Sequence, residues 1–384
     1  MIADFLIPIQ QDVHVELNKL HKHCIGNSIV INSELLGFPK LDDISIAFIG
    51  VEESRASKNN KGTAKAPQFV RNELYKLQQG NWKFKIADLG NLKINRSNEK
   101  TSYKNATQVF YYLLQQKIIP IIIGGTHALT YAMYRAYDEF KKNITLAVVD
   151  SQFDLGRAQS HIHFNNYLSH IIMRKPNNLF NYKNLGFQTY FVNQEEINLL
   201  DKMHFDIHRL GEFSEDITIA EPILRDVDLL SIDVSSIRGS DARANENASP
   251  NGFYGEQSCA LAKYAGTSSA LSSFGIFEYN PLYDERGISA KLLAQIVWYF
   301  IEGYANRIVE NPNKKDKNFT KYTVPIQDQG IELHFIKSNI TTKWWLRLKI
   351  DSHYRCVPCS YKDYMVACDS EIPEIWYKIQ RRYH

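Results

Sequence analysis

The chain of 384 residues has little of what marks secreted or membrane-bound proteins. Its five cysteines are few and odd in number, which suits a reducing compartment better than a disulfide framework. No stretch approaches the ~20 apolar residues that a membrane-spanning helix needs. The N-terminal sequence lacks a basic start followed by an apolar segment, so no signal peptide is indicated. We therefore expect a cytoplasmic protein that does not insert into a membrane.

The chain also has little excess charge. It contains 45 basic and 42 acidic residues, and the resulting net charge of +3 is too small to indicate nucleic-acid binding. The densest basic stretch, NPNKKDKNFTK (311–321), also contains Asn, Pro and Asp, which is typical of a solvated loop. Repeats and low-complexity segments are absent, so solenoid folds are excluded. The 44% of apolar residues leave ample material for a core.

Short apolar, β-branched runs recur along the chain, each followed by a segment with helical spacing. Several runs are apolar throughout, as expected of parallel strands that are buried on both faces. In the clearest helix, Ile288, Leu292, Ile296 and Phe300 recur every four residues. This alternation predicts a three-layer α/β/α body with a mainly parallel eight-stranded sheet over residues 1–320. The predicted strands are 44–51, 84–90, 118–125, 144–150, 187–192, 205–211, 227–234 and 272–279.

The sequence pattern changes near residue 320. Three alternating segments predict antiparallel strands, and KSNITT predicts the turn between the last two. A final helix is predicted to begin at Ser360, where Asp363 completes a pattern close to a capping box. Residues 321–384 are therefore predicted to form a small β-plus-helix appendage packed on the body. The three segments are KYTVPI (321–326), IELHFIKSN (331–339) and WWLRLKID (344–351).

The appendage contains CVPC (356–359), whose spacing fits half of a zinc knuckle. A second cysteine pair is absent within the usual distance, although His353 and Cys368 are nearby. A thioredoxin-type redox site would need its own βαβ context. We therefore interpret Cys356 and Cys359 as ordinary structural cysteines.

Polar residues stand where several predicted body strands end. In open α/β sheets, ligands bind outside the carboxyl ends of the strands. Singly, each residue has a purely structural interpretation, as a helix start, an N-cap, a turn residue or an exposed strand end. Together, one His and three Asp provide a ligand set suited to Mn²⁺, and a cation would relieve the repulsion among the carboxylates. The residues are GGTH (124–127), Asp150 and Asp154 in DSQFD, Asp233 in SIDVS, and Glu278.

In the order and spacing of these motifs, the chain resembles the ureohydrolase family of arginase, agmatinase and formimidoylglutamase. That family carries a binuclear manganese site in Gly-Gly-Asp-His, Asp-Ala-His-x-Asp and Ser-x-Asp-x-Asp. This chain has GGTH, DSQFD and SIDVS at the matching places. GTAKAPQFVR (62–71) resembles an entry loop, and FGIFEYNP (274–281) resembles the strand bearing the substrate-binding glutamate. The resemblance covers roughly residues 40–305 and implies an arginase-like fold.

The resemblance also implies the metal ligands. The second ion of the family would share Asp150 and Asp233, but Gln152 and Ser235 occupy the positions of its own histidine and aspartate. A neutral amide and a hydroxyl are much weaker ligands than imidazole and carboxylate. One Mn²⁺ is therefore expected, with the second site degraded. The implied ligands of the first ion are His127, Asp150, Asp154 and Asp233.

For catalysis, the resemblance implies that Glu278 pairs with the cationic amidine of the substrate. It aligns His161 with a loop histidine that is proposed to shuttle protons, and His163 is the competing choice. The implied catalytic residues are thus Asp154, His161 and Glu278, and the implied substrate-binding residues are Glu278 and His161.

Two functions are compatible with this pattern. The first is a hydrolase of C–N bonds in linear amidines, with formimidoylglutamate as the expected substrate because arginase-specific signatures are absent from the loops. The alternative is a catalytically inactive pseudoenzyme that serves as a scaffold or ligand sensor, which Thr126, Gln152 and Ser235 favour. In either case the expected ligand is a small amidine or guanidine-like molecule. The appendage is expected to offer a surface for a protein partner or a second copy of the chain.

Overall fold

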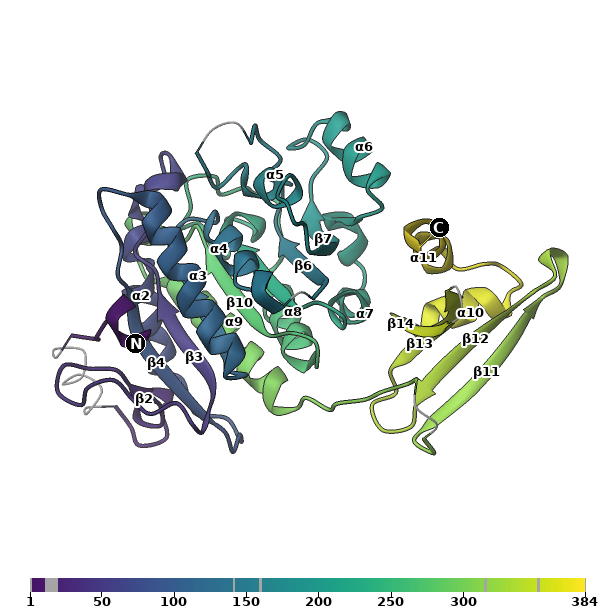
Figure 1. The fold of residues 1–384 in the computed structure, drawn as a ribbon, viewed down its shortest axis with the longest axis horizontal. Coiled ribbons are helices and arrows are strands. Elements are labelled where there is room, and N and C mark those ends of the chain that lie inside the picture. Colours follow the sequence, from purple (N-terminus) through teal and green to yellow (C-terminus); the bar gives the residue numbers. More distant parts are fainter. Residues whose placement is uncertain are drawn as a thin grey trace.

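The computed structural model describes residues 2–10, 20–140, 142–158, 161–313, 316–350 and 353–383. Within these residues the chain forms a large sheet in the body and a separate four-stranded sheet near the C-terminus (Figure 1). The strand order in the large sheet is β1-β4-β3-β5-β10-β9-β6-β7-β8, with β2 paired to β4. Its neighbours are parallel except that β1 runs antiparallel to β4.

The large sheet is mainly parallel, as predicted, but it has ten strands instead of eight. The additional β1 and β2 have two residues each, which is too short to produce a periodic pattern. The strands are β1 (Leu6–Ile7), β2 (Val30–Ile31), β3 (Ile44–Gly50), β4 (Lys85–Leu92), β5 (Ile119–Ile123), β6 (Ile144–Val149), β7 (Leu179–Phe187), β8 (Asp206–Arg209), β9 (Leu229–Asp233) and β10 (Ser273–Phe277).

The predicted strand at 187–192 is wrong, because β7 ends where that segment begins. The sequence of β7 contains Asn181, Lys183 and Asn184, which hide its strand pattern. These polar side chains are nevertheless buried, because each has a partner. Lys183 Nζ, for example, donates to the carbonyl of Ile223 at 2.8 Å and pairs with Asp226 at 2.5 Å.

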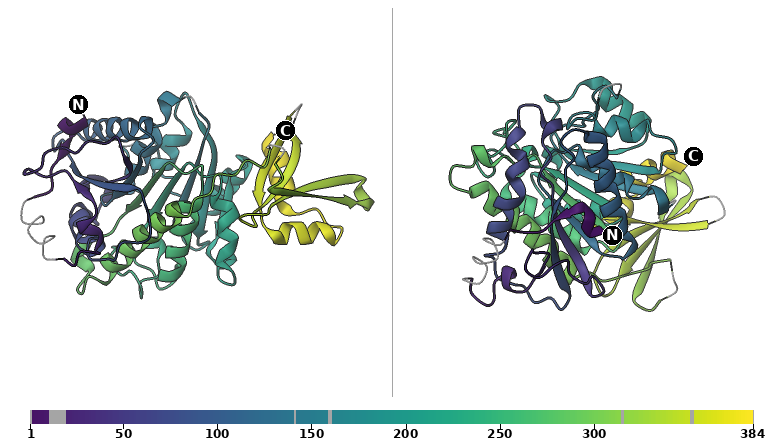
Figure 2. Two further views of the ribbon diagram at one scale, coloured as in Figure 1. Left: turned by 90° about the horizontal axis from the view of Figure 1, so that it is seen from below. Right: turned by 60° about the vertical axis from the view of Figure 1, so that its left-hand side comes forward.

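Helices cover both faces of the large sheet, which gives the predicted three layers (Figures 1 and 2). One core cluster contains apolar residues of α2, α8 and α9, and the other contains residues of α3, α4 and α5. In α9 the predicted stripe is buried except at Ile288, which is 51% exposed because it is the first residue of the helix. The body helices are α2 (Ala66–Leu74), α3 (Glu99–Gln115), α4 (Leu129–Arg135), α5 (Tyr167–Ile172), α6 (Gln194–Lys202), α7 (Ala220–Leu224), α8 (Gly255–Thr267) and α9 (Ile288–Ala305).

Two glycines turn the chain sharply after β5. Gly124 and Gly125 have φ angles of +84° and +81°, which side chains other than that of glycine rarely adopt. A Cβ on Gly124 would lie 2.8 Å from the Cβ of Ala66, and one on Gly125 would lie 2.8 Å from the carbonyl oxygen of Glu53. The turn therefore fits closely against the loops beside it and directs His127 to the carboxyl edge of the sheet.

The appendage contains more structure than predicted. The three predicted strands and the helix predicted from Ser360 are present, and Ser360 forms the full capping box with Asp363. Strand β14 and a second helix, α11, are additional. Its core includes Cys359, whereas Cys356 lies on the opposite face of β14, so the two thiols do not form half of a zinc knuckle. The elements are β11 (Phe319–Ile326), β12 (Ile331–Ser338), β13 (Trp344–Ile350), β14 (His353–Cys359), α10 (Tyr361–Cys368) and α11 (Glu374–Tyr383).

The appendage contacts the body at the edge of the large sheet where β7, β8 and β9 begin. Arg225, which follows α7, donates to the carbonyl of Trp344 at 2.6 Å, and Arg382 of α11 pairs with Asp206 of β8 at 2.9 Å. Seen from below, the appendage projects at one end of the molecule (Figure 2). The appendage thus lies at the amino ends of these strands.

A domain boundary between residues 320 and 321 stays a prediction. Of the helices described, none is both long and apolar enough to cross a bilayer.

Candidate metal centre

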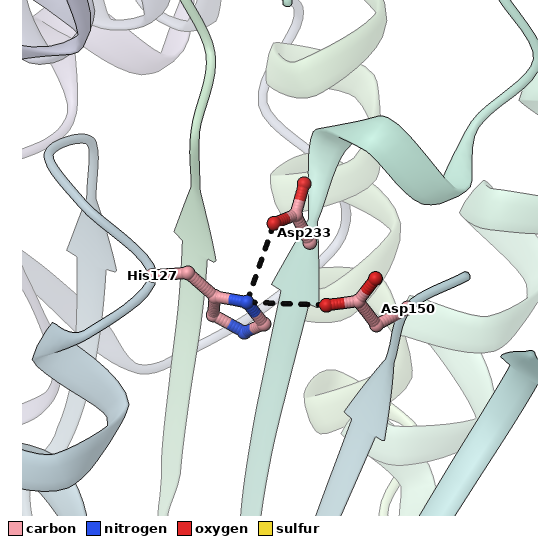
Figure 3. A group of neighbouring side chains, drawn as sticks. All are labelled: His127, Asp150 and Asp233. Carbon is pink, nitrogen blue, oxygen red and sulfur yellow. Dashed lines mark ion pairs between the residues drawn. The ribbon is translucent and has the colours of Figure 1, made fainter. Parts of the chain in front are cut away.

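Four acidic or imidazole side chains meet at the carboxyl edge of the large sheet. His127 follows β5, Asp150 and Asp154 follow β6, and Asp233 ends β9. His127 Nδ1 lies 3.3 Å from an Oδ2 atom of each aspartate. Figure 3 shows the imidazole facing Asp150 and Asp233. Since β5, β10, β9 and β6 are neighbouring parallel strands, their ends bring these distant residues together.

The cluster fits a metal ion: His127, Asp150 and Asp233 each offer a ligand atom within 4.8 Å of the others, and Asp154 faces His127 beside them. Ligand atoms ~2.1 Å from an ion, at angles between octahedral and tetrahedral, lie about 3.0–3.4 Å apart. The 3.3 Å separations fall in that range. His127 Nδ1 and Asp154 Oδ2 are buried and have no hydrogen-bond partner among the described residues, a costly arrangement unless an ion binds them. One imidazole and three carboxylates form a set suited to Mn²⁺.

The other ring nitrogen of His127 is held by hydroxyl groups. Nε2 lies 2.9 Å from Ser231 Oγ and 3.3 Å from the hydroxyl of Tyr167. Ser231 in turn lies 2.6 Å from Thr130 Oγ1. These contacts orient the ring so that Nδ1 faces the aspartates, as second-layer groups do around metal-binding histidines. Sequence reasoning missed Tyr167 and Thr130, because no local pattern connects them with His127.

The cluster is electrostatically strained without a cation. Burial raises the pKa of Asp150, as does the charge of Asp233, and burial with the charge of Asp150 raises the pKa of Asp154 well above its usual value. Burial lowers the pKa of His127, but the interaction with the three carboxylates 3.3 Å from Nδ1 outweighs burial and raises that pKa well above the usual value. A divalent ion would remove this conflict among the charges.

Gln152 and Ser235 contact two of the aspartates through their backbone N–H groups. Gln152 N donates to Asp150 Oδ1 at 3.0 Å, and Ser235 N donates to Asp233 Oδ1 at 2.7 Å. Gln152 is partly exposed, whereas His127 is fully buried. The described group of His, Cys, Asp and Glu side chains close enough to share one ion contains His127, Asp150 and Asp233.

Glu278 lies beside this cluster, directly after β10. It is 3% exposed and has a φ of +65°. Its Oε1 accepts hydrogen bonds from Ser57 Oγ at 2.7 Å and from the backbone N–H of His127 at 2.9 Å, and its Oε2 accepts one from Asn60 at 2.9 Å. Burial, together with the charge of Asp233, raises the pKa of Glu278 to about 7. Sequence reasoning also missed Ser57 and Asn60, which lie in an irregular loop more than 200 residues earlier.

The structure does not place the two loop histidines in the buried cluster. His161 is exposed, and its carbonyl accepts a hydrogen bond from Asn166 at 3.1 Å. His163 is partly buried, and burial together with the charge of Lys58 lowers its pKa. The neighbouring Phe164 N donates to the carbonyl of Ala56, which ties this loop to the loop that carries Ser57. The catalytic roles of His161 and His163 stay predictions.

Comparisons with known proteins agree with this architecture. The model of the arginase family matches residues 44–302. Formimidoylglutamase of Bacillus subtilis (strain 168) is 22% identical over 279 residues, covering 67% of this chain and 86% of that protein. Formimidoylglutamase of Clostridium tetani (strain Massachusetts / E88) is 24% identical over 293 residues, covering 70% and 85%.

Solved structures show the same fold. The crystal structure of the Bacillus subtilis formimidoylglutamase has a TM-score of 0.64 at 20% identity, covering 71% of this chain and 91% of that one. Trypanosoma cruzi formiminoglutamase with Mn²⁺ has a TM-score of 0.63 at 18% identity, covering 70% and 96%. The fold and the family match agree, and the chain belongs to the arginase family.

Proposed function

We propose that the protein is a manganese-dependent hydrolase that cleaves a C–N bond in a small linear amidine, using one bound ion. The observation that carries the proposal is the convergence of three aspartate oxygens on His127 Nδ1 at 3.3 Å, with Glu278 hydrogen-bonded to the same residue. The similarity to two formimidoylglutamases supports a substrate of the formimidoylglutamate type.

The ion would act on the attacking water and on the C=N bond, whereas Glu278 would hold the cationic amidine of the substrate. When bound, Mn²⁺ supplies positive charge that lowers the pKa of water and polarises a C=N bond. A carboxylate has about four acceptor positions, and three of those on Glu278 are taken by Ser57, Asn60 and the N–H of His127. The remaining position can accept an N–H of a cationic amidine and fix its carbon beside the ion.

Proton transfer is assigned by resemblance to the family. By that resemblance Asp154, a buried carboxylate of the cluster, would accept the proton from the attacking water. His161, on the exposed loop after β6, would donate a proton to the departing amine.

A second candidate function is a pseudoenzyme that binds a ligand without turning it over. Gln152 and Ser235 favour it, because their side chains lack the imidazole and carboxylate of a second metal site. One cation positions and acidifies water less effectively than two. This candidate predicts binding of metal and amidine with no products.

The two candidates are separated by measuring metal content and products together. The purified protein is loaded with Mn²⁺, its metal content is determined, and ammonia, formamide and urea are assayed with formimidoylglutamate, agmatine, arginine and 4-guanidinobutyrate. We expect at most one ion per chain and release of formamide from formimidoylglutamate, which Glu278→Gln abolishes. Metal binding without any product would support the pseudoenzyme, and absence of metal binding would contradict the hydrolase.

A further inference from the structure

A cavity of about 790 Å³ lies between helices α3 and α4, which pack side by side (Figure 1). Its volume falls within the range of ~300–1,000 Å³ that is usual for small-molecule sites. Among the described residues that line it are none of the candidate metal ligands and no residue of the large sheet. It is therefore distinct from the candidate metal centre. The lining residues that matter here are Lys100, Tyr103, Lys104, Tyr111, Tyr131 and Ile162.

We propose that this cavity is a second ligand site, which binds a small molecule with a planar aromatic ring joined to an anionic group. The inference goes beyond the proposed hydrolase, because such a ligand is neither the amidine nor the metal. A nucleoside monophosphate and an aromatic carboxylate both have this chemistry, and binding measurements distinguish them. Support comes from the rings that line the cavity, from its charges and from its position beside the loop that carries His161.

Tyrosine rings form the apolar part of the lining. Tyr103, Thr107 and Tyr111 recur every four residues along α3, so they lie along one face of that helix. Tyr131 lines the same cavity from α4. Aromatic groups pair in offset-stacked or edge-to-face arrangements, which contribute more than the burial of area alone. Three rings from two helices therefore favour a planar aromatic ligand over an aliphatic one.

The rings are held in place by contacts within the body. Tyr111 packs against Phe140 with ring centroids 5.3 Å apart, and Tyr131 packs against His170 at 6.2 Å. The hydroxyl of Thr107 also joins the two helices, because it lies 3.3 Å from a backbone carbonyl of α4. The cavity is thus formed before a ligand enters, which lowers the entropic cost of binding.

Two lysines supply the charge that would bind an anion. Lys100 and Lys104 lie one turn apart on α3, and both are exposed at the rim of the cavity. Neither forms an ion pair in the part of the chain that the structure describes. Both ammonium groups can therefore turn toward a phosphate or carboxylate, with which they would form charge-assisted hydrogen bonds.

The acidic residues of the lining do not cancel this charge. Asp138 is shared by two arginines, since Arg135 Nε lies 2.5 Å and Arg174 Nη2 lies 2.6 Å from the same carboxylate oxygen. Among the described lining residues Glu139 is the remaining carboxylate, and it is exposed. Cations thus outnumber carboxylates around the cavity, which favours an anionic group over an ammonium group.

The hydroxyl of Tyr103 adds a hydrogen-bond donor. Tyr103 is 7% exposed, and its hydroxyl forms no hydrogen bond within the described residues. Burial, together with the charge of Glu99, raises the pKa of this hydroxyl well above its usual value, so the group keeps its proton. It can therefore donate to a hydroxyl or a ring nitrogen of a ligand.

The cavity also touches the loop that follows β6. Ile162 lines the cavity and packs against the core cluster that contains residues of α3 and α4. It follows His161 directly, and Phe164 ties the same loop to the carbonyl of Ala56. A ligand in the cavity would contact Ile162 and would make local opening of this loop less frequent.

The inference is tested by binding to the full-length protein as purified, without any need for amidine hydrolysis. AMP and 3-indolepropionate, which join a ring to an anion, are titrated by calorimetry beside adenosine and inorganic phosphate, which have only one of the two groups. We expect AMP or 3-indolepropionate to bind more tightly than either partial ligand. Lys100→Gln and Lys104→Gln should each weaken this binding ~10-fold, since loss of one charged hydrogen bond changes affinity by about that factor.

Two further variants serve as controls, and thermal unfolding of each free variant shows whether it is folded. Lys104→Arg keeps the charge and should lose less affinity than Lys104→Gln. Lys202→Gln changes an exposed lysine of α6 that does not line the cavity, and it should bind like the wild type. Hydrogen exchange locates the ligand, which should slow exchange in α3 and in residues 161–166.

Tighter binding of AMP would support a nucleotide as the ligand, and tighter binding of 3-indolepropionate would support an aromatic carboxylate. Phosphate that binds as tightly as both would indicate a site for simple anions, and adenosine that matches AMP would show that the lysines are not needed; either result would overturn the inference. Binding that both glutamine variants leave unchanged, or that protects only other segments, would place the ligand elsewhere and would also overturn it. The same holds if neither AMP nor 3-indolepropionate binds.

Discussion

His127 Nδ1 and Asp154 Oδ2 lie 3.3 Å apart in the interior of the body, and neither atom has a hydrogen-bond partner among the described residues. Two buried polar atoms that face each other without a hydrogen bond would normally cost stability, because the contact between them replaces their lost hydrogen bonds to water only in part. The arrangement is explained if both atoms belong to a site that an ion completes. The metal should therefore affect folding as well as activity.

The first prediction concerns metal and stability. Mn²⁺ should bind with at most one ion per chain and raise the melting temperature, since an ion at 100 times its Kd stabilises the folded state by about 2.7 kcal/mol. Asp150→Asn should abolish binding because the site loses a charged ligand, while the exposed Asp201→Asn serves as the control. The measurements are elemental analysis and thermal unfolding with and without a chelator. Two ions at full occupancy in the wild type would contradict the prediction.

The second prediction concerns Gln152 and Ser235, the positions at which a second ion is expected to lack ligands. Gln152→His combined with Ser235→Asp returns an imidazole and a carboxylate beside Asp150 and Asp233. A second Mn²⁺ should bind at the usual two-metal spacing of ~3.5–4 Å, and amidine hydrolysis should rise. Metal stoichiometry and turnover are compared with those of the wild type. A double variant that holds two ions and hydrolyses nothing would favour the pseudoenzyme.

The third prediction concerns the orientation of His127. Ser231→Ala removes the hydroxyl that lies 2.9 Å from His127 Nε2. Loss of the hydrogen bond to the ring nitrogen that faces away from the metal should weaken Mn²⁺ affinity about 10–100-fold. The affinity is measured by titration, and Ser240→Ala, at an exposed position outside the site, is the control. An unchanged Kd would mean that Tyr167 alone orients the ring.

The fourth prediction concerns the pH dependence of appendage docking. Burial raises the pKa of Asp206, but the charges of Arg382 and Lys183 outweigh burial and hold it below 3.8. The ion pair therefore stabilises the folded state above pH 3.8, and this stabilisation is lost as the pH falls through the lowered pKa. Asp206→Asn should lower the free energy of unfolding by about 2 kcal/mol at pH 7. In denaturant titrations the difference from wild type should shrink below pH 3.8, and a difference constant down to pH 2 would contradict the assignment.

Much of the fold could be read from local patterns. Runs such as Ile119–Ile123 and Ile144–Val149 are buried on both faces, so their apolar sequences indicate parallel strands directly. β7 could not be located in this way, because its buried Lys183 and Asn184 depend on partners from distant segments. β14 was missed for a related reason, since it lies at the edge of the small sheet and its first three residues are exposed.

The sequence by itself determined where the strands that carry the candidate metal ligands end, and it named those candidates. His127, Asp150, Asp154 and Asp233 stand in short motifs, and the Gly-Gly turn before His127 is visible in the letters. Only the tertiary structure decided how these residues are supported and what lies beside them. Ser57 reaches Glu278 across 221 positions of the chain, and Tyr103 and Tyr131 line one cavity because α3 and α4 pack side by side. Periodicity reports the environment of a residue along its own helix or strand, whereas contacts between loops depend on how the whole sheet is ordered.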